Sequence, residues 1–174
     1  MKGHVIISHG LESSPDATKA TALSQAAEAL GWTHERPDYR SWDNDFSRSR
    51  LGDVQGRILR LHEIASRVQG PLVLAGSSMG AFISARVSLQ VPVVGLFLMA
   101  PPTQLEGYDF KLEAAHVPTH VVHGWDDELI PATEVARWAA ARRDHTIFVN
   151  DSHRLVDHVA FCGEEFARLL QKLA

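Results

Sequence analysis

Short, uninterrupted runs of apolar residues recur along the chain, separated by longer stretches in which apolar residues return at helical spacing. Such runs are typical of strands buried on both faces of a parallel sheet. The pattern predicts six strands, at 5–7, 32–39, 71–75, 93–99, 119–123 and 145–149. It predicts helices at 17–30, 51–68, 79–89, 132–141 and 156–173. This alternation predicts an α/β fold, a three-layer sandwich in which helices cover both faces of one parallel sheet.

Capping and loop residues set the expected boundaries of these elements. Ser14 or Asp16 is expected to cap the first helix, and Gly31 to end it. The segment 40–49 is polar with aromatic interruptions, and we expect it to form a loop over the carboxyl ends of the strands. Segment 103–117 shows neither the helical nor the strand spacing of apolar residues, and it is expected to be irregular.

Length, composition and charge indicate one soluble domain. The 174 residues suffice to bury a core without disulfides, and no internal repeat or linker divides the chain. The net charge of −4 gives no basic surplus that would favour nucleic acid or an anionic membrane. The single cysteine, Cys162, cannot form an intramolecular disulfide, and the apolar start at 1–7 is too short for a signal peptide. We therefore expect a cytoplasmic protein that binds neither nucleic acid nor membrane.

The third apolar run leads into the pentapeptide 76–80, Gly-Ser-Ser-Met-Gly, where a buried strand must turn sharply into a helix. Glycines stand two residues before and after Ser78, which is the G-x-S-x-G spacing of a nucleophile elbow. So tight a turn strains its central residue and leaves no room for side chains at the glycine positions. In an ordinary strand-to-helix loop, however, the same serine would only cap the helix. A catalytic Ser78 therefore requires a base and an acid elsewhere in the chain.

Candidate partners for Ser78 follow other predicted strands. Ligands of an open parallel sheet bind outside the carboxyl ends of its strands, so catalytic residues should follow strands. His9 follows the first strand, the acidic residues 126–128 follow the fifth, and His153 follows the sixth. A nucleophile, an acid and a base are therefore expected at one edge of the sheet, in the chain order Ser, Asp, His.

Over essentially its whole length the chain resembles a small α/β-hydrolase without a lid. The resemblance rests on four motifs: His9-Gly10, the elbow at 76–80, the stretch 123–131 and His153. The stretch 123–131 is similar to the family's H-G-x-x-D-x-x-V-P signature, which implies that the acid is Asp127.

Further features bear on this resemblance. The segment 9–15 is similar to small bacterial esterase-like members of the family. The glycine often found shortly before the family's histidine is absent, since Asn, Asp and Ser occupy 150–152. The segment between Pro102 and Pro118 is too short for the lid domain of lipases.

The resemblance implies acyl transfer by a catalytic triad without a cofactor. Ser78 would be the nucleophile, His153 the base that takes and returns its proton, and Asp127 the residue that orients His153. The backbone N–H of Met79 and, by resemblance, that of Leu11 would form the oxyanion hole. We expect a serine esterase for small, soluble carboxylic esters, because a site without a lid is open to water. A thioesterase or amidase with the same triad, or a non-catalytic interaction module that keeps the fold, is the alternative.

Other acids and histidines compete for these roles. A neighbouring acid, Asp126 or Glu128, could supply the carboxylate instead. His158 is expected at the start of the last helix, and His145 at the opposite edge of the sheet. Both are therefore weaker candidates for the base than His153.

A metal site is a further alternative. His9 and His123 stand beside glycines at strand ends and are expected to hydrogen-bond loop backbone. With His153 and Asp127 they could in principle ligate a metal, but no H-E-x-x-H pattern is present and the serine elbow would then be unexplained. We therefore expect no metal and no cofactor. Cys162 lies in a helical stretch and is expected to be a small core residue.

The substrate pocket is harder to predict. Trp42, Phe46, Tyr108 and Trp125 lie in predicted loops around the site. They could line a pocket for the acyl or alcohol group, or they could pack against the domain. The expected partner is a small-molecule ester or thioester, because the same catalytic motifs serve both.

Overall fold

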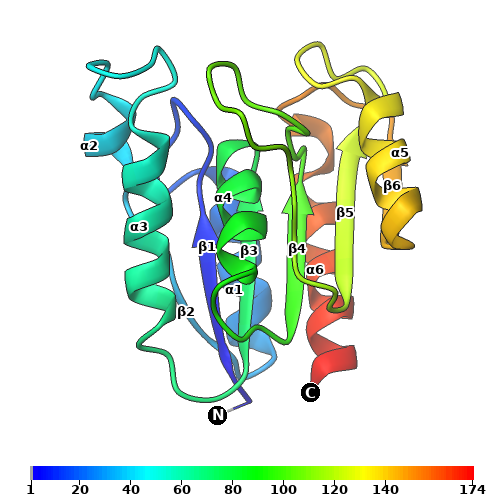
Figure 1. Ribbon diagram of the computed structural model, residues 1–174. Coiled ribbons are helices and arrows are strands. Elements are labelled where there is room, and N and C mark those ends of the chain that lie inside the picture. Colours follow the sequence, from blue (N-terminus) through cyan, green and yellow to red (C-terminus); the bar gives the residue numbers. More distant parts are fainter. Residues whose placement is uncertain (1) are drawn as a thin grey trace.

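The computed structural model describes residues 2–174 as one six-stranded parallel sheet with helices on both faces (Figure 1). Met1 lies outside the described residues. It is the first residue of the segment 1–7, which is expected to be too short for a signal peptide. The strands are β1 (His4–Ser8), β2 (Thr33–Glu35), β3 (Leu72–Ser77), β4 (Gly95–Met99), β5 (Thr119–Gly124) and β6 (His145–Val149). Their order is β2-β1-β3-β4-β5-β6, and every pairing is parallel. The predicted three-layer fold is confirmed.

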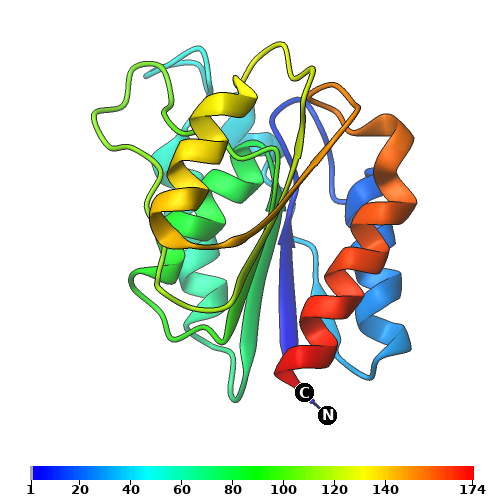
Figure 2. The same cartoon turned by 90° about the vertical axis from the view of Figure 1, so that its right-hand side faces the viewer.

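The helices divide between the two faces of the sheet. They are α1 (Thr18–Ala29), α2 (Arg40–Asp43), α3 (Val54–Ala65), α4 (Met79–Ser88), α5 (Ala132–Arg142) and α6 (Val159–Leu173). Figure 2 shows α1 and α6 side by side on one face, with α3, α4 and α5 on the other. Within residues 2–174 no inserted lid covers the carboxyl ends of the strands, and no helix is both long and apolar enough to cross a membrane.

Successive residues of each strand enter two different cores. In β3, Leu72 and Leu74 contact the core beneath α3 and α4, whereas Val73 and Ala75 contact the core beneath α1 and α6. Both faces of the central strands β1, β3, β4 and β5 are buried, which explains why these strands are continuous apolar runs in the sequence. Cys162 of α6 is fully buried in the second core, as predicted, and burial raises the pKa of its thiol to about 11.

The first helix begins without the predicted cap. Ala17 occupies the N-cap position of α1, and no side chain caps the helix there. Ser14 instead forms a turn ahead of the helix: its hydroxyl accepts a hydrogen bond from the N–H of Asp16, and its carbonyl accepts one from Ala17. The prediction that Ser14 or Asp16 caps this helix is therefore wrong. Gly31 follows the helix end with a φ of 77°, as predicted.

The second strand is shorter than predicted. β2 covers 33–35 rather than 32–39, because Pro37 cannot donate to a ladder and the N–H of Tyr39 turns instead to Nε2 of His9 (3.0 Å). The loop predicted at 40–49 opens with the four-residue helix α2.

Two helices also begin later than predicted. The carboxylate of Asp53 caps α3 by accepting from the N–H of Gly56 (2.9 Å), so this helix starts at Val54 rather than at residue 51. The last helix opens with a single 3₁₀ turn, Val156–His158, before α6 begins. The fourth strand starts two residues after its predicted position at 93.

Candidate active site

The turn from β3 into α4 places Ser78 in a strained conformation. Its φ of 53° and ψ of −115° belong to a region that residues with a side chain rarely adopt. A Cβ added at Gly80 would lie 1.9 Å from the carbonyl oxygen of Ser8, and one at Gly76 would lie 2.3 Å from the carbonyl of Gly80. Only glycine therefore lets β1, β3 and α4 approach closely enough to form the turn.

Ser78, His153 and Asp127 form one hydrogen-bonded chain. Oγ of Ser78 lies 2.9 Å from Nε2 of His153, and Nδ1 of His153 lies 2.7 Å from Oδ2 of Asp127. The three side chains come from the carboxyl ends of β3, β6 and β5. Both distances fall within the range at which a base can take a proton from a nucleophile and be oriented by an acid.

The surroundings of Asp127 decide which nitrogen of His153 carries the proton. Burial by itself would raise the pKa of Asp127, but hydrogen bonds from His153 and from the N–H groups of Ile130 (2.8 Å) and Leu129 (2.9 Å) outweigh burial and lower it. An ionised carboxylate only accepts hydrogen bonds, so Nδ1 of His153 must be the donor. Nε2 is then an acceptor that faces the hydroxyl of Ser78.

The competing acids do not reach the imidazole ring of His153. Glu128 accepts a hydrogen bond from the backbone N–H of His153 (3.1 Å), and the side chain of Asp126 is exposed. The backbone N–H of His153 therefore donates to Glu128 and its ring donates to Asp127, so Asp127 is the acid that contacts the ring.

Asp151 fixes the loop that carries His153, where the expected glycine is missing. Its buried carboxylate accepts hydrogen bonds from the N–H groups of Ser152 (2.7 Å) and Asp157 (3.0 Å). Nδ1 of His158 donates to the same carboxylate (2.8 Å), which removes His158 from competition with His153. The side chain of Asp151 thus ties the backbone before and after His153 to one carboxylate.

A buried ion pair holds the loop after β1. The guanidinium of Arg57, 1% exposed, binds both carboxylate oxygens of Asp43 (2.5 and 2.6 Å). It also donates to the carbonyl oxygens of His9 (2.8 Å) and Gly10 (3.2 Å). Because the N–H of Tyr39 occupies Nε2 of His9, the proton of that ring lies on Nδ1, which donates to the carbonyl of Gly10 (2.7 Å).

This arrangement sets the direction of the peptide that joins Gly10 to Leu11. Its carbonyl is held by Arg57 and His9, and the N–H of Leu11 points the opposite way because the peptide is trans. Gly10 also lies against the elbow, since a Cβ added to it would be 3.6 Å from Cβ of Ser78. The loop is therefore fixed beside the serine.

Met79 offers a second backbone N–H at the same place. It is the first residue of α4, so its N–H has no acceptor within the helix. Leu11 and Met79 line the same cavity as Ser78.

The remaining histidines near the sheet edge bond loop backbone, as predicted. Nε2 of His123 lies 2.9 Å from the carbonyl oxygen of Ile130, and burial lowers the pKa of both His9 and His123. Among residues 2–174, the ligand atoms of His9, His123, His153 and Asp127 do not lie close enough together to hold one metal ion.

Sequence reasoning missed Arg57, Asp43 and Asp151. A signal for Arg57 existed, because it falls on the apolar face of α3, one residue before Ile58 and four before Leu61. A charged residue on a core-facing position needs a buried partner. Asp43 and Asp151 lie in polar segments whose pattern gives no comparable signal.

A cavity of about 640 Å³ lies beside Ser78 and His153. Its apolar wall comes from the side chains of Leu51, Leu105, Leu129, Ile130 and Val156. The four loop aromatics are not among its lining residues; Trp125, for example, stacks on Phe148 with ring centroids 4.5 Å apart. Trp42 and Tyr108 pack against the core beneath α3 and α4, whereas Phe46, 63% exposed, lines neither the cavity nor the core.

Solved structures that resemble this chain share its fold. A candidate hydrolase of the alpha/beta superfamily from Xanthomonas campestris is 53% identical, with a TM-score of 0.96, and the match covers 98% of this chain and 99% of that one. An alpha-beta serine hydrolase homologue from Coxiella burnetii is 26% identical (TM-score 0.72, covering 97% and 85%). An a/b serine hydrolase without lid from X. campestris is 19% identical (TM-score 0.70, covering 97% and 81%). No protein-family model and no curated protein matches the chain.

Replacing Arg57 with Met should destabilise the protein by about 3 kcal/mol, because the substitution leaves the buried carboxylate of Asp43 unpaired. Urea unfolding measures this change. Arg60→Met is the matched control: Arg60 lies on the same helix, but its ion pair with Glu63 is partly exposed, so the loss should stay below about 1 kcal/mol. Equal losses in the two variants would contradict the assigned role of Arg57.

Proposed function

Because the chain belongs to the alpha/beta superfamily of hydrolases, we propose that it is a serine hydrolase that cleaves carboxylic esters of small, soluble substrates. One observation carries the proposal: the unbroken hydrogen-bonded chain from Ser78 through His153 to Asp127. A helix-capping serine would not need a histidine oriented by a buried carboxylate.

The proposed reaction proceeds in two stages. As Oγ of Ser78 bonds to the carbonyl carbon of the ester, its proton passes to Nε2 of His153, and Asp127 stabilises the resulting imidazolium. His153 then gives the proton to the departing alcohol oxygen, which leaves an acyl group on Ser78. A water molecule, deprotonated by His153, attacks this acyl group and releases the carboxylic acid, and the proton returns to Oγ of Ser78.

The N–H groups of Leu11 and Met79 are the proposed oxyanion hole. The orientation of the Gly10–Leu11 peptide and the position of Met79 at the start of α4 support this role. Arg57 does not touch the substrate in this account; it positions the loop that carries the first donor.

The cavity supports small esters as the substrate class. Its volume of about 640 Å³ lies within the usual range for small-molecule sites, and its wall combines apolar side chains with the reacting polar groups. Without a lid, nothing in the described chain would shield a long acyl chain from water.

Hydrolysis by matched serine variants tests the proposed nucleophile. Ser78→Ala should lower kcat by at least about 10³-fold, because it removes the atom to which the acyl group bonds in the proposed reaction. Ser77→Ala should keep most of the activity, since the hydroxyl of Ser78 is the one that contacts His153. The assay is a panel of soluble esters, thioesters and amides, with circular dichroism as the check on folding.

Two results of this assay would contradict the proposal. If Ser78→Ala turns over the esters as fast as the wild type, Ser78 is not the nucleophile. If thioesters or amides are cleaved and esters are not, the triad is retained but the proposed substrate class is wrong.

Acyl-chain preference tests the second part of the proposal. Among p-nitrophenyl esters, acetyl and butyryl esters should have a higher kcat/KM than decanoyl and longer ones, because no lid among residues 2–174 covers a long acyl chain. A steep preference for the long chains, measured below their critical micelle concentrations, would overturn it.

A further inference from the structure

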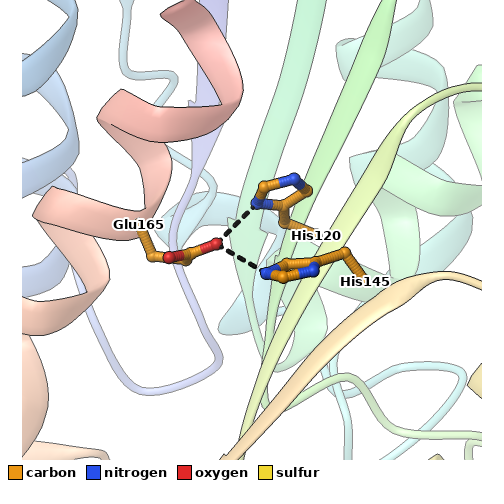
Figure 3. A group of neighbouring side chains, drawn as sticks. All are labelled: His120, His145 and Glu165. Carbon is orange, nitrogen blue, oxygen red and sulfur yellow. Dashed lines mark ion pairs between the residues drawn. The ribbon is translucent and has the colours of Figure 1, made fainter. Parts of the chain in front are cut away.

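A group of two histidines and a glutamate lies at the amino edge of the sheet, away from the candidate active site. His120 of β5 and His145 of β6 are directly paired in the sheet, and Glu165 of α6 faces them (Figure 3). Their nearest ligand-type atoms all lie within 4.8 Å of one another. Neither the proposed reaction nor the cavity beside Ser78 involves these residues.

One carboxylate oxygen faces both imidazole rings. Oε1 of Glu165 lies 2.8 Å from Nδ1 of His120 and 3.0 Å from Nε2 of His145. The other oxygen, Oε2, accepts a hydrogen bond from Arg168 (2.8 Å), which orients the carboxylate. The three atoms therefore converge on one point between the sheet and α6.

The ring nitrogen of His120 lacks the partner that its burial demands. His120 is 4% exposed, and its Nδ1 finds no hydrogen-bond partner among residues 2–174, although Oε1 of Glu165 is near. Two electron-rich atoms at this distance need a positive charge between them. A hydrogen bond would require a proton close to the line between Nδ1 of His120 and Oε1 of Glu165, and the orientation of the two groups does not meet that requirement. A metal ion could instead bind both atoms from one side of that line.

We propose that His120, His145 and Glu165 bind one Zn²⁺ ion, which ties α6 to the two outermost strands on that side of the sheet. Two imidazole nitrogens and one carboxylate oxygen form a donor set that zinc takes in proteins. Ligand atoms of a tetrahedral zinc, each about 2.1 Å from the metal, lie roughly 3.4 Å apart, so the side chains must separate by about half an ångström. The side chain of His145 is 51% exposed and has room to shift away from Glu165, whereas the buried His120 and Glu165 must separate by small rotations of their own side chains.

The surroundings leave room for a fourth ligand. A cavity of about 430 Å³, lined in part by His145, Glu165 and Arg168, opens beside two of the three proposed ligands. A zinc-bound water can occupy it, and zinc can enter through it.

Zinc binding by the wild-type protein and by two matched histidine variants tests the proposal. Equilibrium dialysis with metal analysis should give one Zn²⁺ per chain, and His145→Ala should weaken binding by at least about tenfold. His116→Ala, which changes an exposed histidine outside the group, should leave the affinity unchanged. Zn²⁺ at 100 times its Kd should also raise the Tm by about 5 °C or more, and Mg²⁺ should not.

Zinc binding at His153 is the main competing explanation, so the same titration is carried out on His153→Ala. Retention of the tight site in His153→Ala supports the proposal. Loss of that site in His153→Ala, with retention in His145→Ala, would overturn it, as would the absence of tight binding in the wild type. Glu165→Gln should weaken binding as well; if it fails to fold, His145→Ala, which changes an exposed side chain, still decides the question.

Discussion

The close approach of β1, β3 and α4 at the Ser78 turn is the constraint on which the rest of the site depends. Gly76 and Gly80 permit it, because any side chain at either position would meet backbone atoms of the neighbouring segment. Ser78 is kept in this strained conformation, with its positive φ, by the buried strand β3 before it and the buried helix α4 after it. The geometry of a single turn therefore fixes where the hydroxyl of Ser78 lies, and His153 and Asp127 must be brought to it by other loops.

Buried charged side chains bring those groups to the turn. Arg57 binds carbonyl oxygens of the loop after β1, Asp127 binds N–H groups of the loop after β5, and Asp151 binds N–H groups of the loop after β6. Each of these charges satisfies backbone groups that loops leave unpaired. The active edge is thus ordered by side chains as well as by the sheet. That order is what lets short loops, without a lid, hold a reactive geometry.

The pattern of the sequence predicted the sheet and the three residues that the structure brings into hydrogen-bond contact, Ser78, His153 and Asp127, but not the supporting contacts. Continuous apolar runs identify the central strands β1, β3, β4 and β5 because both faces of these strands are buried. The G-x-S-x-G spacing identifies the turn because sterics leave no alternative to glycine. The predicted end of β2 and the predicted cap of α1 were wrong. A hydrogen bond to His9 takes the chain out of the sheet after β2, and a turn at Ser14 precedes α1. Neither contact leaves a periodic pattern in the sequence. Asp43 and the pairing of His120 with His145 depend on which segments meet in space, which local patterns do not encode.

The account stands on Ser78 as a nucleophile activated by His153, and covalent labelling tests this most directly. A fluorophosphonate reacts with an activated serine and loses fluoride, so one phosphonyl group should appear, by mass spectrometry, on the peptide that contains residues 77 and 78. The account predicts stoichiometric labelling of the wild type and of Ser77→Ala, and no labelling of Ser78→Ala. A well-folded wild-type protein that remains unlabelled would contradict it and would favour an interaction module that keeps only the fold.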